Sequence, residues 1–240
     1  MKKLLGFSIF LVFVLIASLT AEAKVTLPAI FSDNMVLQQN TQVNVWGKAA
    51  PGEKVTVKAS WLDKAVTAKA AANGKWTVKL KTPKATTNQS VTVSGENEIT
   101  INNVLIGEVW LCTGQSNMEF PVSRHPDVKW NTGMLNEAEE LKDADYPEIR
   151  LFHVKHQLAH EGELDDCEGE WLVCNPKNLY DFSAVGFVFG RKLYKELKMP
   201  VGLIQSTWGG THAESWTKLD VMKKNPLYAD VLKDFALEGV

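Results

Sequence analysis

The pattern of apolar and polar positions changes character partway along the chain. Between residues 24 and 101, short runs such as 55–59 and 76–80 alternate apolar and polar side chains. This two-residue alternation is typical of strands that bury one face. The dipeptide Asn73-Gly74 stands just before the second of these runs and predicts a tight β-hairpin turn. Short strands at regular spacing, without a helical period, predict an antiparallel β-sandwich of about 80 residues.

Beyond residue 103 the pattern is that of an α/β domain. Residues 104–113 are almost continuously apolar, which is typical of a strand buried on both faces of a parallel sheet. Residues 201–204 predict a second apolar strand, and Pro200 ends the helix before it. The helix, predicted over residues 182–198, has the 3.6-residue period, and its predicted buried face is Phe182, Val185, Phe189, Leu193 and Leu197. Strand, helix and strand in this order indicate α/β architecture.

Each predicted strand of the second half leads into a turn of small and polar residues. Gly114-Gln115-Ser116 follows the first strand, and Gly209-Gly210-Thr211 follows the second. Thr211 and Glu214 have capping-box spacing, which predicts a helix that begins there. Ligands of such sheets bind at the carboxyl ends of the strands, so both turns are candidate parts of a site.

Ser116 is the candidate nucleophile. A turn after a strand can present its hydroxyl at the sheet edge, where backbone N–H groups can stabilise the oxyanion of an attacked ester. Gly209 and Gly210 offer further N–H groups at a predicted helix start. The alternative is that Ser116 only caps a helix, because Ser116 and Glu119 also have capping-box spacing. Pro121 argues against a long helix at this place.

The first 23 residues predict a secretory signal peptide. Lys2 and Lys3 precede an apolar run over residues 4–19, and Ala21-Glu22-Ala23 forms a small-x-small cleavage site. The run is shorter than the stretch of about 20 residues that spans a bilayer. We therefore expect a secreted or periplasmic protein without stable membrane association after cleavage.

Charge gives a domain boundary and argues against one class of partner. The whole chain has a formal net charge of −2, so no nucleic-acid partner is expected. Residues 24–101 contain ten lysines and five acidic residues, whereas acidic residues exceed basic ones from Asn102 onward. We therefore place the β-sandwich at 24–103 and the second domain at 104–240. The lysines could bind acidic glycans, but they also fit the exposed faces and edges of strands.

Two groups of residues could take part in metal binding or redox chemistry. They are the three cysteines, Cys112, Cys167 and Cys174, and three histidines, His153, His156 and His160. The second and third cysteines could form a disulfide across a hairpin, or remain buried free thiols. The cysteine spacing matches no zinc motif. The histidines are interleaved with apolar residues and fit a surface strand or loop better than a metal site, so no metal is expected.

Four segments together resemble one known family. Residues 110–119 read Trp-Leu-Cys-Thr-Gly-Gln-Ser-Asn-Met-Glu and resemble the nucleophile block of the sialate O-acetylesterases, within the SGNH-hydrolase superfamily. Residues 27–38, 182–194 and 200–211 resemble further blocks of that family, in the expected order. The resemblance implies an incomplete SGNH (flavodoxin-like) α/β hydrolase domain after the β-sandwich. It also implies removal of O-acetyl groups from sialic acid or other acetylated sugars, without a cofactor.

The resemblance also implies roles for individual residues. Ser116 would be the nucleophile, and its own N–H with that of Gly209 or Gly210 would line the oxyanion hole. Gln115 and Asn117 would belong to the same oxyanion and substrate site, and Asn117 would help to hold the turn.

The catalytic base of the family is not recognised in this sequence. The Asp-x-x-His block and the Gln-Gly-Glu block of the family are missing, and His212 next to the glycines is interpreted as incidental. We therefore expect the N-terminal portion of an esterase, which alone hydrolyses acetyl esters feebly or not at all. A reading frame that continues after Val240 and encodes Asp-x-x-His would support this. The alternative is a non-catalytic, secreted sugar-binding or adhesion protein.

Overall fold

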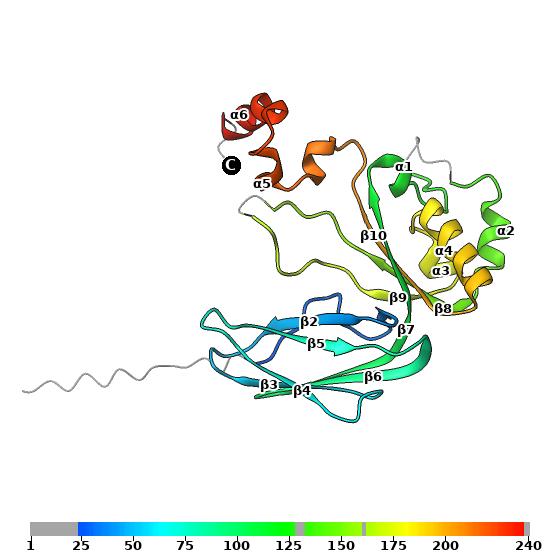
Figure 1. Cartoon of the computed structure of the whole chain (residues 1–240). Helices are drawn as coiled ribbons and strands as arrows, with labels where there is room; N and C mark the ends of the chain where they lie inside the picture. Colours follow the sequence, from blue (N-terminus) through cyan, green and yellow to red (C-terminus); the bar gives the residue numbers. More distant parts are fainter. Residues whose placement is uncertain (1–23, 128–132, 160–161, 238–240) are drawn as a thin grey trace, which may run out of the picture.

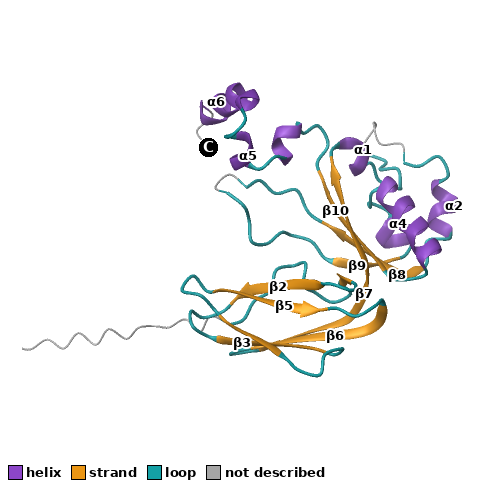
Figure 2. Ribbon diagram, viewed as in Figure 1, coloured by secondary structure: helices purple, strands orange, loops and turns teal. Residues whose placement is uncertain are grey.

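The computed structural model describes residues 24–127, 133–159 and 162–237, so the predicted signal peptide lies outside the described residues. Its strands form an eight-stranded sheet and a two-stranded sheet. Helices gather beside one part of the large sheet, and the two-stranded sheet lies against another part (Figures 1 and 2). The chain is therefore a mixed α/β protein dominated by one large sheet.

The first half of the chain supplies two layers of strands around one apolar core. β2 (Gln42–Lys48) pairs with β5 (Lys75–Lys81) in the small sheet, while β3 (Lys54–Ala59), β4 (Val66–Lys69) and β6 (Thr86–Ser94) belong to the large sheet. The small sheet lies over these strands in Figure 1. Strand β5 buries every second residue, namely Trp76, Val78 and Leu80, which is the alternation expected of a half-buried strand.

The turn at Asn73-Gly74 is present, but it does not make the predicted hairpin. Gly74 has a positive φ of 76° and its N–H donates to Ala71 O, but Asn73 has no positive φ, so the turn is not the type I′ turn that Asn-Gly favours. The turn joins β4 to β5, and these strands pair with β3 and β2 in different sheets. The hairpin prediction was wrong because turn residues fix the local reversal, whereas the partners of the strands depend on packing across the core.

A single long strand connects the two parts of the chain. β7 (Glu98–Gly114) pairs antiparallel with β6, and parallel with β1 (Val36–Gln38) and β10 (Val201–Thr207). The sequence predicts two separate strands here, divided at Asn102–Asn103. The strand instead continues through this position, where Asn103 has a positive φ of 53°. The proposed domain boundary therefore falls within a continuous strand.

The second half has the α/β arrangement that its pattern predicts. β10 lies parallel to β7 and to β8 (Tyr146–His153), and β9 (Trp171–Cys174) pairs antiparallel with β8. Four helices lie together beside these strands in Figure 1: α1 (Ser116–Glu119), α2 (Glu137–Lys142), α3 (Pro176–Leu179) and α4 (Ala184–Leu197). The strand ends at Gly114 and Thr207 stand next to each other in the register of the β7–β10 pair.

Helix α4 confirms the predicted helix, but the predicted buried face is only partly correct: Phe182 is buried and Leu193 packs against the core. Its buried residues are Ala184, Gly186, Phe187 and Gly190, whereas Val185, Phe189 and Leu197 are exposed. A Cβ on Gly190 would lie 2.5 Å from Leu203 Cδ1. The prediction counted large apolar residues only, and missed that two glycines allow the helix to approach the sheet closely.

Short helices follow β10 and lie beyond its carboxyl end in Figure 1: η1 (Ala213–Trp216), α5 (Leu219–Met222), η2 (Pro226–Tyr228) and α6 (Ala229–Leu237). The predicted capping box at Thr211 and Glu214 is wrong. The first of these helices begins at Ala213, and the Thr211 hydroxyl donates back to Trp208 O. None of the helices in the described ranges is long and apolar enough to cross a membrane.

The three cysteines lie in the described part of the chain and are free thiols. The suggested disulfide between Cys167 and Cys174 is therefore wrong. Cys167 packs against the apolar core of the first half, whereas Cys174 is buried in the core of the second half. Two residues of neighbouring sequence thus belong to different cores.

Candidate active site

Ser116 lies at the carboxyl end of β7, where the strand turns into α1. Gly114 ends the strand with a φ of 145°, a conformation that favours glycine. Gln115 is the N-cap residue of α1, and Ser116 is the first residue of the helix. The alternative that Ser116 caps the helix is therefore wrong, because Gln115 occupies that position.

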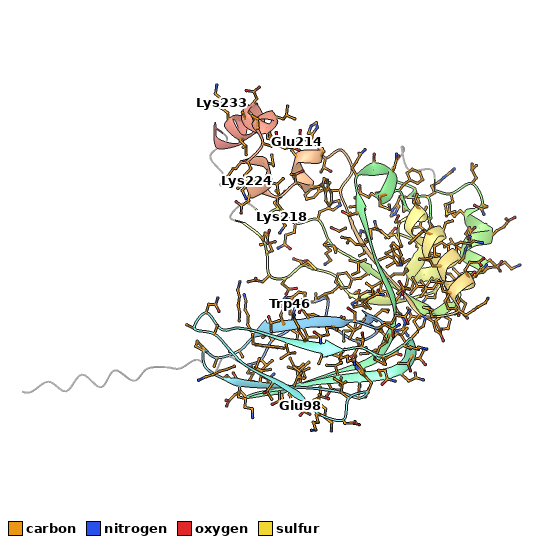
Figure 3. All side chains as sticks on the ribbon, in the orientation of Figure 1. Trp46, Glu98, Glu214, Lys218, Lys224 and Lys233 are labelled. Carbon is orange, nitrogen blue, oxygen red and sulfur yellow. The ribbon has the colours of Figure 1, made fainter. Side chains whose placement is uncertain are left out.

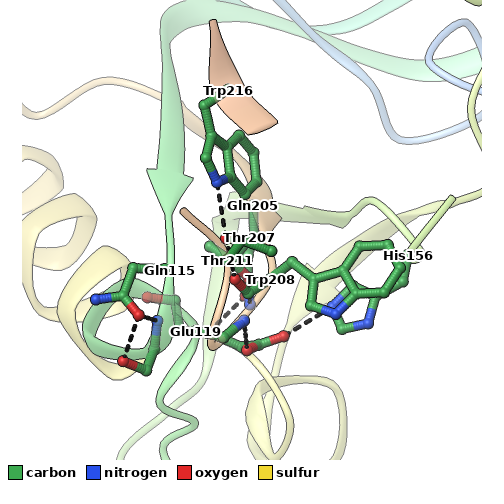
Figure 4. A network of polar contacts seen from close by, with 11 residues as sticks. Gln115, Glu119, His156, Gln205, Thr207, Trp208, Thr211 and Trp216 are labelled. Atoms are coloured by element: carbon green, nitrogen blue, oxygen red, sulfur yellow. Dashed lines mark hydrogen bonds and ion pairs between the residues drawn. The ribbon is translucent and has the colours of Figure 1, made fainter. Parts of the chain in front are cut away.

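The side chain of Gln115 holds the serine. Its Oε1 accepts hydrogen bonds from the Ser116 backbone N–H at 3.0 Å and from the Ser116 hydroxyl at 2.8 Å (Figure 4). An amide oxygen is a neutral acceptor and takes no proton at ordinary pH. Gln115 therefore fixes the position of the hydroxyl without activating it.

The glycine turn after β10 lies directly beside the serine. The N–H of Trp208 donates to Gly114 O at 3.1 Å, which ties the two strand ends together. A Cβ on Gly209 would lie 3.6 Å from both Cα and Cβ of Ser116. Gly210 has a φ of 78°, and a Cβ there would meet nothing within 4 Å. The two turns named from the sequence thus meet at one end of the sheet, next to open space.

Glu119 connects the serine helix to the glycine turn and to the segment after β8. One carboxylate oxygen accepts the N–H of Gly209, and the other lies 2.7 Å from His156 Nε2 (Figure 4). The His156 ring stacks on Trp208, with centroids 4.3 Å apart and planes 5° apart. The Glu119 side chain is 22% exposed and the His156 side chain 42%. One carboxylate therefore fixes three segments of the chain around the serine.

The free backbone N–H groups near Ser116 differ from those expected from the sequence. The Gly209 N–H already donates to Glu119, and the Ser116 N–H donates to Gln115. Within the described residues, the N–H groups of Gly210 and Asn117 have no acceptor. The turn is held by Gln115 rather than by the side chain of Asn117, which makes no hydrogen bond in the described part of the chain.

A buried glutamine links the end of β10, just before the glycine turn, to the start of α4. Gln205 is fully buried in β10; its Oε1 accepts from Ser183 N–H at 2.7 Å and its Nε2 donates to Thr207 Oγ1 at 3.0 Å. Ser183 is the N-cap of α4, and its hydroxyl accepts from Gly186 N–H at 3.0 Å. Buried polar groups that are fully paired fix one arrangement. This chain of bonds fixes the start of α4 against the last residues of β10.

Hydrogen bonds beyond the glycines hold the other side of the turn. The Thr211 hydroxyl donates to Trp208 O at 2.6 Å, and Trp216 Nε1 donates to Thr211 Oγ1 at 2.8 Å (Figure 4). The indole of Trp216 is partly exposed next to the turn. Two tryptophans, Trp208 and Trp216, therefore flank the candidate site.

The histidines do not gather into a metal site in the part of the chain that the structure describes, where no group of three or more possible ligands occurs. His160 lies outside the described residues. His153 ends β8 and is partly buried; burial lowers the pKa of its imidazole, and the nearby His156 lowers it further. His212 directly precedes the short helix η1.

Sequence reasoning missed the role of Glu119 and His156. It assigned the first only to capping and the second to a variable surface segment. The two are 37 residues apart, and Glu119 and Gly209 are 90 residues apart. No local pattern reports contacts over such separations, so only the fold could bring these groups together.

The chain is similar to a family model and to several known proteins. Residues 106–238 match the family model of "carbohydrate esterase, sialic acid-specific acetylesterase". The chain is 33% identical to the sialate O-acetylesterase of Mus musculus over 215 residues, with 81% of this chain and 38% of that protein covered. It is 32% identical to the human sialate O-acetylesterase over 205 residues, with 78% and 37% covered.

A solved structure is also similar. It is a carbohydrate acetylesterase from Xanthomonas citri, with a TM-score of 0.72 and 31% sequence identity, and the match covers 81% of this chain and 42% of that one. The chain thus spans well under half the length of these relatives. The match of the family model to more than half of the chain shows that the chain belongs to the family of sialic acid-specific carbohydrate esterases.

Proposed function

We propose that this chain carries the nucleophile side of an esterase site that removes O-acetyl groups from sialic acid or other acetylated sugars. Ser116 is the nucleophile. The observation that carries the proposal is the contact between the Ser116 turn and the Gly209–Gly210 turn at the carboxyl ends of two parallel strands. The names of the relatives, sialate O-acetylesterase and carbohydrate acetylesterase, support the choice of substrate.

In the proposed reaction the Ser116 oxygen attacks the acetyl carbonyl carbon, and the carbonyl oxygen becomes an oxyanion. The free N–H groups of Gly210 and Asn117 are the available donors to that oxyanion. The Gly209 N–H would join them only when Glu119 releases it. A base takes the proton of the Ser116 hydroxyl and passes it to the sugar oxygen, which leaves as a hydroxyl when the ester C–O bond breaks. Water then hydrolyses the acetyl-serine to acetate and restores the serine.

The hydroxyl needs a base that the described residues do not bring to it. Among them, Ser116 Oγ is hydrogen-bonded to Gln115 Oε1. We propose that a base, of the Asp-x-x-His kind that the family resemblance implies, comes from polypeptide outside these 240 residues. Without it the attack on an ester slows by several orders of magnitude.

Exposed apolar side chains support a surface for such additional polypeptide. Leu111 on β7 is 61% exposed, and Trp110 beside it packs edge-on against Phe189 of α4, which is itself exposed. Of the described strands, only β10 pairs with residues 108–114 of β7. Parallel strands are usually covered on both faces. An apolar surface beside an open strand edge is typical of a site that other chain segments cover.

Chemical rescue tests the nucleophile and the missing base together. We expect the isolated chain to hydrolyse p-nitrophenyl acetate no faster than Ser116→Ala, because loss of the base alone removes most of the catalysis. Added imidazole, a diffusible base, should restore hydrolysis in the chain but not in Ser116→Ala. The Ser116→Ala rates also correct for the direct reaction of imidazole with the ester.

Ser215→Ala, which removes an exposed serine of the same half, is the matched control and should respond to imidazole like the unchanged chain. Equal rates for the chain and Ser116→Ala at every imidazole concentration would contradict a nucleophilic Ser116. A large rate that depends on Ser116 without imidazole would instead contradict the missing base. Acetate release from an O-acetylated sialic acid, measured under the same conditions, tests the substrate.

The remaining organisation of the protein is part of the same proposal. We propose export after removal of residues 1–23, a β-sandwich domain at 24–103 and an SGNH-type domain that begins at 104. The continuous strand β7 would then connect the two domains.

A further inference from the structure

A cavity of about 300 Å³ lies away from the serine, between the β2–β5 sheet and the segment that joins β8 to β9. None of its lining residues belongs to the Ser116 site. Figure 3 shows Trp46 of β2 on the side of the small sheet that faces the rest of the chain. Its lining includes Trp46, Lys48, Lys75, Thr77, Asp165 and Asp166.

Trp46 provides a fixed and partly open aromatic surface. Its indole is 36% exposed and stands edge-on against Phe31, with centroids 4.6 Å apart and planes 82° apart. Its Nε1–H donates to Asp165 O at 3.3 Å. Both contacts restrict the rotation of the ring, so its exposed part is presented in one orientation. A tryptophan with one apolar and one wet side is common at binding surfaces.

Polar groups surround this ring. In the register of the small sheet, Thr77 lies opposite Trp46 and Lys75 lies opposite Lys48. Lys75 Nζ is 2.7 Å from Asp165 Oδ1, and this hydrogen bond lowers the pKa of the Asp165 carboxyl. The lining thus offers a hydroxyl, ammonium donors and a carboxylate acceptor beside the indole.

The charges of the lining balance. Two lysines, Lys48 and Lys75, face two carboxylates, Asp165 and Asp166. Asp166 is anchored, because its Oδ1 accepts the N–H groups of Ala29 and Cys167, each at 2.8 Å. A site for an anion would need an excess of cations, so the balance favours an uncharged ligand.

We propose that this cavity is a binding site for a neutral saccharide. The apolar face of one pyranose ring packs on Trp46, and its hydroxyls bond to Thr77 and to the Lys75–Asp165 pair. The site does not require hydrolysis at Ser116. It would bind a sugar unit of the carbohydrate chain that is several units away from the acetylated one.

The indole N–H signals of the eight tryptophans allow a direct test by nuclear magnetic resonance. The full chain, labelled with 15N-tryptophan, is titrated with three neutral probes: xylotriose, cellotriose and N,N′-diacetylchitobiose. We expect at least one probe to shift the Trp46 signal along a saturation curve. Trp61, whose Nε1 donates to Lys81 O outside the cavity, serves as the internal control and should not shift.

Variants separate the site from general effects. Trp46→Ala and Thr77→Val should each weaken the binding of the active probe at least about tenfold, which is 1.4 kcal/mol. Trp61→Phe should leave it unchanged. If Trp46→Ala fails to fold, the exposed and conservative Thr77→Val decides the question. An unchanged affinity in a folded Thr77→Val and in a folded Trp46→Ala would overturn the proposal.

Two further outcomes would also overturn it. One is the absence of any shift at Trp46 with all three probes at about 10 mM, where a millimolar site would be nearly filled. The other is tighter binding of the anionic 3′-sialyllactose than of every neutral probe. Binding should persist in Ser116→Ala, so failure of the esterase proposal and failure of this proposal give different results.

Discussion

Removal of the Glu119 carboxylate should loosen the candidate site and destabilise the whole chain. Glu119→Ala deletes the acceptor of the Gly209 N–H and the partner of His156. The side chain is 22% exposed, so the bond to the glycine is largely shielded from water. A new solvent contact therefore compensates only a part of what is lost.

The size of the effect follows from the two contacts. A hydrogen bond to a charged group contributes about 1.5–3 kcal/mol. The contact with the more exposed His156 contributes less than about 1 kcal/mol. We expect the free energy of unfolding to fall by about 2–3 kcal/mol, which corresponds to roughly 5–10 °C in Tm for a chain of this size.

Urea denaturation with matched variants tests this reasoning. Glu119→Gln keeps one acceptor without charge and should lose roughly 1 kcal/mol. His156→Phe keeps a ring on Trp208 and removes only the contact with the carboxylate, so it should lose less than about 1 kcal/mol. Glu196→Ala removes an exposed partner of Lys192 on α4 and measures the background.

Two results would refute the proposed link through Glu119 between α1 and the glycine turn. If Glu119→Ala lowers the free energy of unfolding no more than Glu196→Ala does, the carboxylate does not join α1 to the glycine turn. A larger loss in His156→Phe than in Glu119→Ala would also contradict the assignment, because the stronger bond is the one to Gly209.

Three further predictions concern packing, thiols and pH. Gly190→Ala should destabilise the chain by about 1–3 kcal/mol, because its Cβ would lie 2.5 Å from the fully buried Leu203, and thermal unfolding measures this. In the native chain, iodoacetamide should modify Cys167 well before Cys174, whose burial raises the pKa of its thiol to about 12, as peptide mass spectrometry would show. The free energy of unfolding should fall as the pH drops below about 6.5, because burial lowers the pKa of His153 in the folded chain, so that the unfolded chain takes up the proton first. Urea unfolding at several pH values should show a weaker dependence on pH for His153→Gln than for the unchanged chain.

Each of these has a clear contrary result. An unchanged or raised Tm in Gly190→Ala would mean that the gain in helix propensity outweighs the contact with β10. Equal modification rates for Cys167 and Cys174 would contradict the burial of the second thiol. An identical pH slope in His153→Gln would assign the slope to other groups.

The sequence by itself determined the elements with strong local patterns. Alternation identifies strands such as β5, the 3.6-residue period identifies α4, and the apolar run identifies the second half of β7. It also placed Ser116 and the glycine turn at strand ends, because small and polar residues directly after an apolar run can be recognised without the tertiary structure. These features depend on residues that are neighbours along the chain.

Tertiary structure alone decided which faces and which distant groups meet. Helix α4 buries Phe187 together with Gly186 and Gly190 and leaves Val185 and Phe189 exposed, because close contact with the sheet requires small side chains beside Phe187. The turn at Asn73-Gly74 joins strands of different sheets, and β7 passes through the expected boundary, because strand partners are selected by the core. The contacts from Glu119 to Gly209 and to His156 arise only when parallel strands bring their ends together, since no local pattern encodes a contact across 90 residues.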